Sequence, residues 1–201
     1  MKRRLMLAMV AATTALAGCK DSTGDDGVGS GSLSFAYAGA RSGSYGAEGE
    51  FEKLGPSTFA KKSFATGVSL SDANGNLVGI MAYAPVTATT GDEAVLLLPP
   101  VTGGEDLDLD PTCINHCAVG LITFGVNPDA PVDLSEGFLT STGTVHVTSV
   151  ANGRIRGTFS GTAVDDSGAQ TLTVTNGSFD VPLLHESQFL AERRRALRMR
   201  P

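Results

Sequence analysis

The chain has 201 residues, a length that favours one domain with extensions. Residues 20–185 hold seven Lys or Arg against nineteen Asp or Glu, a net charge of −12, whereas the two ends are basic. A body this acidic repels phosphate groups, which excludes nucleic acid as its partner. No apolar run reaches the roughly 18 residues that a membrane-spanning helix needs, so we expect no transmembrane helix.

The first residues, MKRRLMLAMVAATTALAGC, have the parts of a secretory signal peptide. A basic start is followed by a short apolar stretch, Leu5 to Ala15, and then by Leu16-Ala17-Gly18-Cys19. This tetrapeptide resembles the lipobox of bacterial lipoproteins. The resemblance implies that residues 1–18 are removed and that Cys19 becomes an acylated N-terminus, with palmitate among its acyl groups. The alternative is an ordinary signal peptide with a chance cysteine.

Residues 19–31 are predicted to be the lipidated Cys19 and a flexible, acidic Gly/Ser tether. About 12 such residues have a mean reach of roughly 20 Å. Two or more acyl chains hold a protein stably at a membrane. Lys20 follows the cysteine where an Asp would signal inner-membrane retention, so the same resemblance points to the outer membrane. Whether the protein faces the periplasm or the cell surface is left open.

The chain from 32 to 184 is predicted to be one all-β domain, an antiparallel β-sandwich or a barrel-like meander. Apolar residues alternate with small ones from Leu33 to Tyr37, a period of two that is typical of strands. Asn74-Gly75 lies between two apolar runs, a strong hairpin signal. The continuous apolar runs 94–98 and 118–124 suit buried strands. A chain of about 150 residues can bury a core of its own.

The C-terminal half predicts four consecutive strands separated by turns. The turns are expected at Ala151-Asn152-Gly153, at Asp165 to Gly168 and at Asn176-Gly177. Thr residues fill the polar positions, as on a sheet with one wet face. The stretch from Gly143 to Pro182 resembles uncharacterised β-rich lipoprotein domains of Gram-negative bacteria, which implies a fold but no activity.

Two cysteines remain after Cys19, in Cys113-Ile114-Asn115-His116-Cys117. In an oxidising compartment this pair predicts a short-loop disulfide. The alternatives are a metal or redox site that uses Cys113, His116 and Cys117, or two free thiols. A zinc site usually needs further ligands elsewhere, and the sequence has no second Cys/His cluster.

The run Glu105 to Asp110 has an acid at alternate positions, so an extended backbone would place Asp106, Asp108 and Asp110 on one side. This makes them a weak candidate site for Ca²⁺, which prefers carboxylate oxygens. The run lacks the glycine and terminal glutamate of an EF-hand loop. The alternative, which we favour, is a solvated acidic loop with no metal.

No motif commits the chain to catalysis or to a cofactor. The sequence has three histidines and no G-x-S-x-G elbow, H-E-x-x-H or P-loop. We therefore expect a membrane-anchored envelope lipoprotein that is a non-catalytic binding or structural module, with a protein or small-ligand partner that the sequence does not name. A lipocalin-like carrier of a small ligand is the first alternative, and a hydrolase is the second.

The last segment, 185–201, is predicted to be a basic tail with helical preference. It carries five arginines, together with Phe189, Leu190 and Leu197 as a weak apolar side. One interpretation is a segment that rests on anionic lipid headgroups. The alternative is a solvated chain terminus.

Overall fold

The computed structural model describes residues 29–51, 62–72, 75–113, 116–127 and 136–185. These residues form ten strands and no helix. The strands are β1 (Gly31–Gly39), β2 (Gly43–Gly49), β3 (Phe64–Asp72), β4 (Gly75–Pro85), β5 (Gly91–Leu98), β6 (Glu105–Asp108), β7 (Val119–Val126), β8 (Gly137–Ala151), β9 (Arg154–Asp165) and β10 (Thr171–His185).

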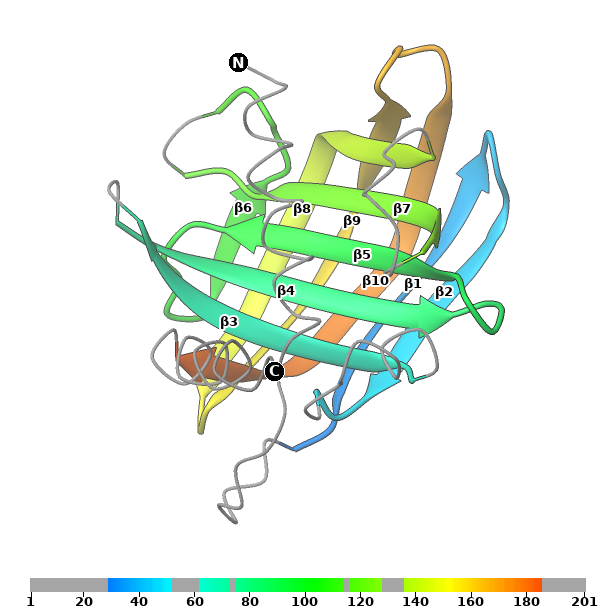
Figure 1. The fold of residues 1–201 in the computed structure, drawn as a ribbon. Helices are drawn as coiled ribbons and strands as arrows, with labels where there is room; N and C mark the ends of the chain where they lie inside the picture. Colours follow the sequence, from blue (N-terminus) through cyan, green and yellow to red (C-terminus); the bar gives the residue numbers. More distant parts are fainter. Residues whose placement is uncertain (1–28, 52–61, 73–74, 114–115, 128–135, 186–201) are drawn as a thin grey trace.

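Seven strands, β3, β4, β5, β7, β8, β9 and β10, close into a β-barrel (Figure 1). The β1–β2 hairpin extends the sheet from β10, and β6 adds to β8. The prediction of an all-β sandwich or barrel-like fold is confirmed. One strand pairing was not predicted. β10 pairs with β3 in parallel, at Leu183–His185, while every other named strand pair is antiparallel.

The ten strands belong to one continuous sheet that bends into two layers, which we call the first and the second sheet (Figure 1). The first sheet has the order β2-β1-β10-β9-β8-β6, and the second has the order β3-β4-β5-β7. Along one edge, β10 pairs with β1 and then, beyond Asp180, with β3. In the same way β8 pairs with β7 near Leu139 and with β6 near Val145. Each of the two long strands, β8 and β10, therefore pairs with the first layer along one part of its length and with the second layer along another part.

Apolar side chains from both layers fill the barrel. Fully buried members include Leu33, Ile80, Leu98, Leu109, Val145, Val147, Ile155 and Leu172. Phe35 lies near the centre, stacked on Tyr45 at 4.9 Å between ring centroids and edge-on to Phe159 at 5.8 Å. The inward positions of β9 and β10 recur every second residue, so the alternation in the sequence is the cause of this core.

Two predicted hairpins are confirmed. Asn152 and Gly153 join β8 to β9 with φ of 53° and 68°, the positive values that a two-residue turn between twisted strands requires. Asp72 pairs with Gly75 at the β3–β4 hairpin. The turn that begins at Asp165 also forms, closed by the Gly168 N–H, which donates to the Asp165 carbonyl at 3.1 Å.

The turn expected at Asn176-Gly177 is wrong. β10 runs without interruption through both residues, and they form a β-bulge where the register shifts against β9 and β1. Asn176 has a φ of 53°, the left-handed conformation that both a hairpin turn and a bulge can use. The local signal is therefore the same for the two structures, and pairing with β1 decides between them.

Several boundaries also differ from the expected ones. Gly31, expected in the tether, is the buried first residue of β1, where a side chain would run into the Ala65 carbonyl. β10 ends at His185, one residue beyond the expected domain. The acidic run expected as a loop contains β6, which pairs with β8 from Glu105 to Asp108. β2, which the sequence did not predict, pairs with β1 along its length.

Candidate functional site

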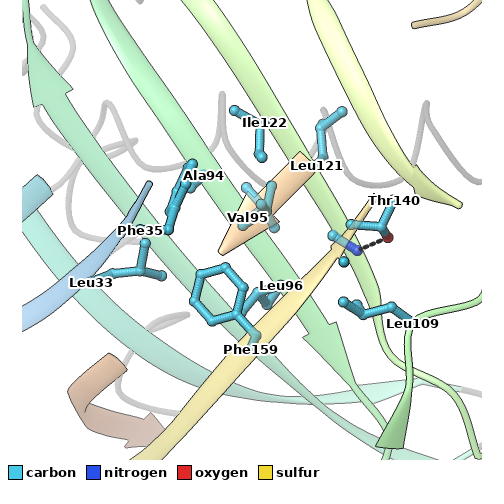
Figure 2. A pocket seen from close by; sticks show the side chains of 13 residues that line it. Leu33, Phe35, Ala94, Val95, Leu96, Leu109, Leu121, Ile122, Thr140 and Phe159 are labelled. Atoms are coloured by element: carbon cyan, nitrogen blue, oxygen red, sulfur yellow. Dashed lines mark hydrogen bonds between the residues drawn. The ribbon is translucent and has the colours of Figure 1, made fainter. Parts of the chain in front are cut away.

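The interior of the barrel has almost no free space. The cavity there has a volume of about 20 Å³, which is room for about one water molecule, and its walls are nearly all apolar. Figure 2 shows Leu33, Phe35, Leu96 and Phe159 converging on it. The only polar contact drawn is the Gly120 N–H, which donates to the Thr140 hydroxyl at 2.8 Å. The side chains that the structure describes around this cavity leave no room for a small-ligand pocket of several hundred Å³.

The candidate site lies on the outer face of the first sheet, where side chains of β8, β9 and β10 line a shallow hollow open to solvent. We call it the polar hollow. Its lining residues are Thr144, His146, Thr158, Phe159, Ser160, Thr175, Asn176, Gly177 and Ser178. The two strand partners of Thr158 are His146 on β8 and Ser178 on β10, so the hollow is built across adjacent strands about 4.8 Å apart.

The residue pairing aligns one row of polar side chains across the sheet. The row runs from Asp106 on β6 through His146, Thr158 and Ser178 to Ser34 on β1. At one end Asp106 Oδ1 lies 2.6 Å from His146 Nδ1, and at the other the Ser178 and Ser34 hydroxyls are 3.2 Å apart. Within the part of the chain that the structure describes, the Thr158 hydroxyl at the centre has no hydrogen-bond partner.

The β-bulge in β10 shapes the floor of the hollow. It gives Thr175 and Asn176, which are consecutive in sequence, exposed side chains in the same hollow. Gly177 follows, and a Cβ there would lie 2.5 Å from the Phe159 carbonyl oxygen and 2.7 Å from the Phe159 ring. The absence of a side chain at Gly177 therefore lets β10 approach β9 closely, beneath two outward polar groups.

An ion cluster lies on the same two strands, near the start of β9. Arg154 Nε donates to Asp180 Oδ1 at 2.7 Å, and Arg156 Nε donates to Asp180 Oδ2 at 2.9 Å. Partial burial raises the pKa of Asp180, but the hydrogen bonds from Arg156 and Arg154 outweigh it and hold that pKa below its ordinary value. Arg154 also donates to the Ser30 carbonyl, which ties the segment before β1 to the sheet.

The predicted cysteine pair is brought together: the Cys113 and Cys117 sulfurs are at bonding distance, 2.02 Å. The bridge lies between β6 of the first sheet and β7 of the second. His116 is exposed. The disulfide that the sequence predicts is present in the structure.

Two of the three aspartates of the weak calcium candidate, Asp106 and Asp110, have different partners. Asp106 contacts His146, and Asp110 accepts hydrogen bonds from the Thr112 N–H and hydroxyl, both at 2.7 Å. The Thr112 hydroxyl is the main cause of a lowered pKa at Asp110. Among the described residues, no group of three His, Cys, Asp or Glu side chains is placed to hold a metal ion.

Other predicted features lie outside the described residues. They are the signal peptide, the lipidation site Cys19, most of the tether and the basic tail from 186 to 201. Over the ranges that the structure does describe, no helix is long and apolar enough to cross a membrane.

The sequence did not predict the polar hollow, although two signals for it are present. The Thr residues at alternate positions of β8, β9 and β10 place hydroxyls on one face. The Asn176-Gly177 dipeptide marks the bulge that adds a second outward side chain. The row itself depends on the pairing of β6, β8, β9, β10 and β1, which no local pattern specifies.

Comparison of the chain with protein-family models, with curated proteins and with solved structures finds no match.

Proposed function

We propose that this chain is an envelope lipoprotein of the outer membrane, anchored through acylated Cys19, whose β-barrel domain is a non-catalytic binding module for neutral saccharides. The polar hollow is the binding surface in this proposal. The proposal rests on the set of hydroxyl and amide groups that the hollow presents to solvent, with Thr158 at its centre.

The chemistry of the hollow favours a neutral, hydroxyl-rich ligand. The Thr, Ser and Asn side chains each offer donors and acceptors of the kind that pair with sugar hydroxyls. The acidic body disfavours anionic ligands. A lipocalin-like carrier has no support, because apolar side chains fill the barrel interior.

A binding experiment with matched variants tests the hollow. Residues 20–201 are titrated with neutral glucan, mannan and N-acetylglucosamine oligomers in a calorimeter. Thr158→Val removes one central hydroxyl at nearly constant shape, and Asn176→Gly removes the amide while tolerating a positive φ. Each lost hydrogen bond should weaken binding about threefold to tenfold.

Thr173→Val, an exposed change on β10 outside the hollow, is the control and should leave affinity unchanged. Binding to none of the oligomers, or equal loss in the control, contradicts the proposal.

The anchor is tested separately from the ligand. The full chain is expressed in a Gram-negative host, and the mature protein is analysed by intact mass spectrometry. The proposal expects an N-terminus at Cys19 with two or three acyl chains, and Cys19→Ser should abolish that mass and the membrane fractionation. An unmodified Cys19 after cleavage at another bond would refute the anchor and leave the hollow untouched.

A hydrolase is the second candidate, and the Asp106–His146 pair is the observation that favours it. A carboxylate on Nδ1 orients an imidazole whose other nitrogen can act as a base. Neither side chain is buried, with 73% and 47% of their areas exposed, and no described hydroxyl hydrogen bonds to His146. Release of reducing sugar by residues 20–201, lost in His146→Ala, would establish this alternative in place of simple binding.

A further inference from the structure

The outer face of the second sheet is apolar, unlike that of the first. In β5, Ala94 and Leu96 belong to the barrel interior, while Val95 and Leu97 point to the opposite side and join a separate cluster. We call this cluster the outer apolar face. Its buried members are Phe64, Val68, Met81, Tyr83, Val95, Val119, Leu121 and Leu139, each no more than 8% exposed.

The burial of this face requires a cover. All members of the cluster lie on the strands themselves except Phe51, which packs edge-on to Phe64 with 5.2 Å between ring centroids. One phenylalanine cannot remove eight side chains on five strands from water. The described residues alone therefore do not account for the burial of this face.

We propose that the C-terminal segment, residues 186–201, docks on the outer apolar face and is its cover in the mature protein. The segment starts at this face: β10 pairs with β3 at Leu183 to His185, and Leu184 packs against the apolar cluster. Chain continuity therefore delivers residue 186 to the rim of the surface.

The length and composition of the segment fit the face. Sixteen residues reach about 24 Å even at the helical rise of 1.5 Å per residue, and five strands are about 19 Å wide between the outer axes. The segment contains Phe189, Leu190, Leu197 and Met199, and its five arginines meet a body with a net charge of −12. By contrast, residues 1–18 are predicted to be removed, and 19–28 are mostly Gly, Ser and Asp.

A tryptophan probe tests the docking directly, because the chain contains no Trp. Phe189→Trp is introduced into residues 20–201, so that the predicted signal peptide cannot act as the cover. Val86→Trp, at a site that is 63% exposed between β4 and β5, is the solvated reference. A docked segment gives emission from position 189 that is blue-shifted from the reference and poorly quenched by acrylamide, in a monomer and without lipid.

Two second-site changes identify the face. In the Phe189→Trp background, Leu97→Ser on the outer apolar face should shift the emission to longer wavelength, and Thr173→Ser on the other sheet, outside the polar hollow, should not. Truncation after His185 should increase binding of the dye ANS to newly exposed apolar surface.

Three results would overturn the proposal. The first is emission equal to that of the reference. The second is a blue shift that appears only as the protein dimerises, which would make a second copy the cover. The third is a blue shift that appears only with vesicles of anionic phospholipid, which would make the segment a membrane contact. The polar hollow is not involved in any of these measurements, so failure here leaves the proposed ligand site intact.

Discussion

The outer faces of the two sheets are built on the same pleated backbone but present opposite chemistry. On the first sheet, β9 alternates buried Ile155, Gly157 and Phe159 with exposed Arg156, Thr158 and Ser160. On the second, β7 is buried at six consecutive positions from Val119 to Phe124. One sheet therefore meets water on its outer side and the other does not. The two faces therefore suit different roles, ligand recognition on the wet face and contact with a covering segment on the dry one.

A charge placed on each outer face gives the largest expected contrast. Leu121→Asp on β7 buries an unpaired carboxylate at a site that is 5% exposed, and should cost about 4 kcal/mol of the free energy of unfolding. Thr158→Asp on β9 stays in water and should change it by no more than about 0.5 kcal/mol. Urea denaturation measures both. Similar losses for the two variants would mean that the faces do not differ as described.

The bulge under the polar hollow is tested by changing its two residues separately. Gly177→Ala forces a Cβ against the Phe159 carbonyl and ring, and should cost about 3 kcal/mol because neither the backbone nor the packed ring can move freely. Asn176→Gly keeps the left-handed backbone and should cost about 0.5 kcal/mol. Thermal unfolding of both variants gives the comparison, and a harmless Gly177→Ala would contradict the close approach of β10 and β9.

Because of Glu93 on β5, we expect the free energy of unfolding of the protein to depend on pH. Burial raises its pKa from 4.5 to about 7. Between these values the folded protein holds a proton that the unfolded chain releases. The free energy of unfolding therefore falls as the pH rises from 4.5 to 7. The whole shift corresponds to about 3 kcal/mol, and because the side chain is half-buried we expect about 2 kcal/mol. Glu93→Gln should remove this dependence, so the difference from wild type in denaturant unfolding should grow across that interval. A constant difference would refute the raised pKa.

The ion cluster on the first sheet has the smallest expected effect and the opposite pH dependence. The pKa of Asp180 is lowered from 3.8, so its pairing with Arg156 and Arg154 stabilises the protein above that value and is lost as the pH falls below it. Asp180 is 41% exposed, so we expect only about 0.5–1 kcal/mol at neutral pH. Comparison of wild type with Asp180→Asn at pH 7 and pH 3 measures it, and added salt should reduce the difference at pH 7.

Local patterns predicted most strands, because side-chain alternation and positive-φ dipeptides act over a few residues. Ile155 to Ala163 and the Asn152-Gly153 turn are clear cases. The same patterns do not specify which strand pairs with which. Asn176-Gly177 has the dihedral preference of a turn, yet pairing with β1 keeps β10 continuous through it as a bulge. Gly31 belongs to β1 because Gly49 of β2 pairs with it, and the acidic run at Glu105 forms β6 because β8 supplies a partner from far along the chain.

The candidate site was less predictable than the fold for the same reason. Thr158 was recognisable as an outward residue, but its neighbours His146 and Ser178 come from two other strands. Asp106 was singled out for its acidic neighbours, whereas its contact is with His146, forty residues away. The disulfide was predictable because Cys113 and Cys117 are close in sequence and need no distant partner.

Residue-resolved chemical shift mapping tests the central claim, that the wet face of the first sheet is the binding surface. Uniformly labelled residues 20–201 are titrated with the neutral oligosaccharide that binds most tightly in calorimetry, and backbone amide shifts are followed. We expect shifts concentrated at His146, Thr158, Thr175, Asn176 and Ser178, with little change at Val95 and Leu121 on the opposite sheet. Shifts concentrated on β3, β4, β5 and β7, or an absence of shifts at saturating ligand, would contradict it.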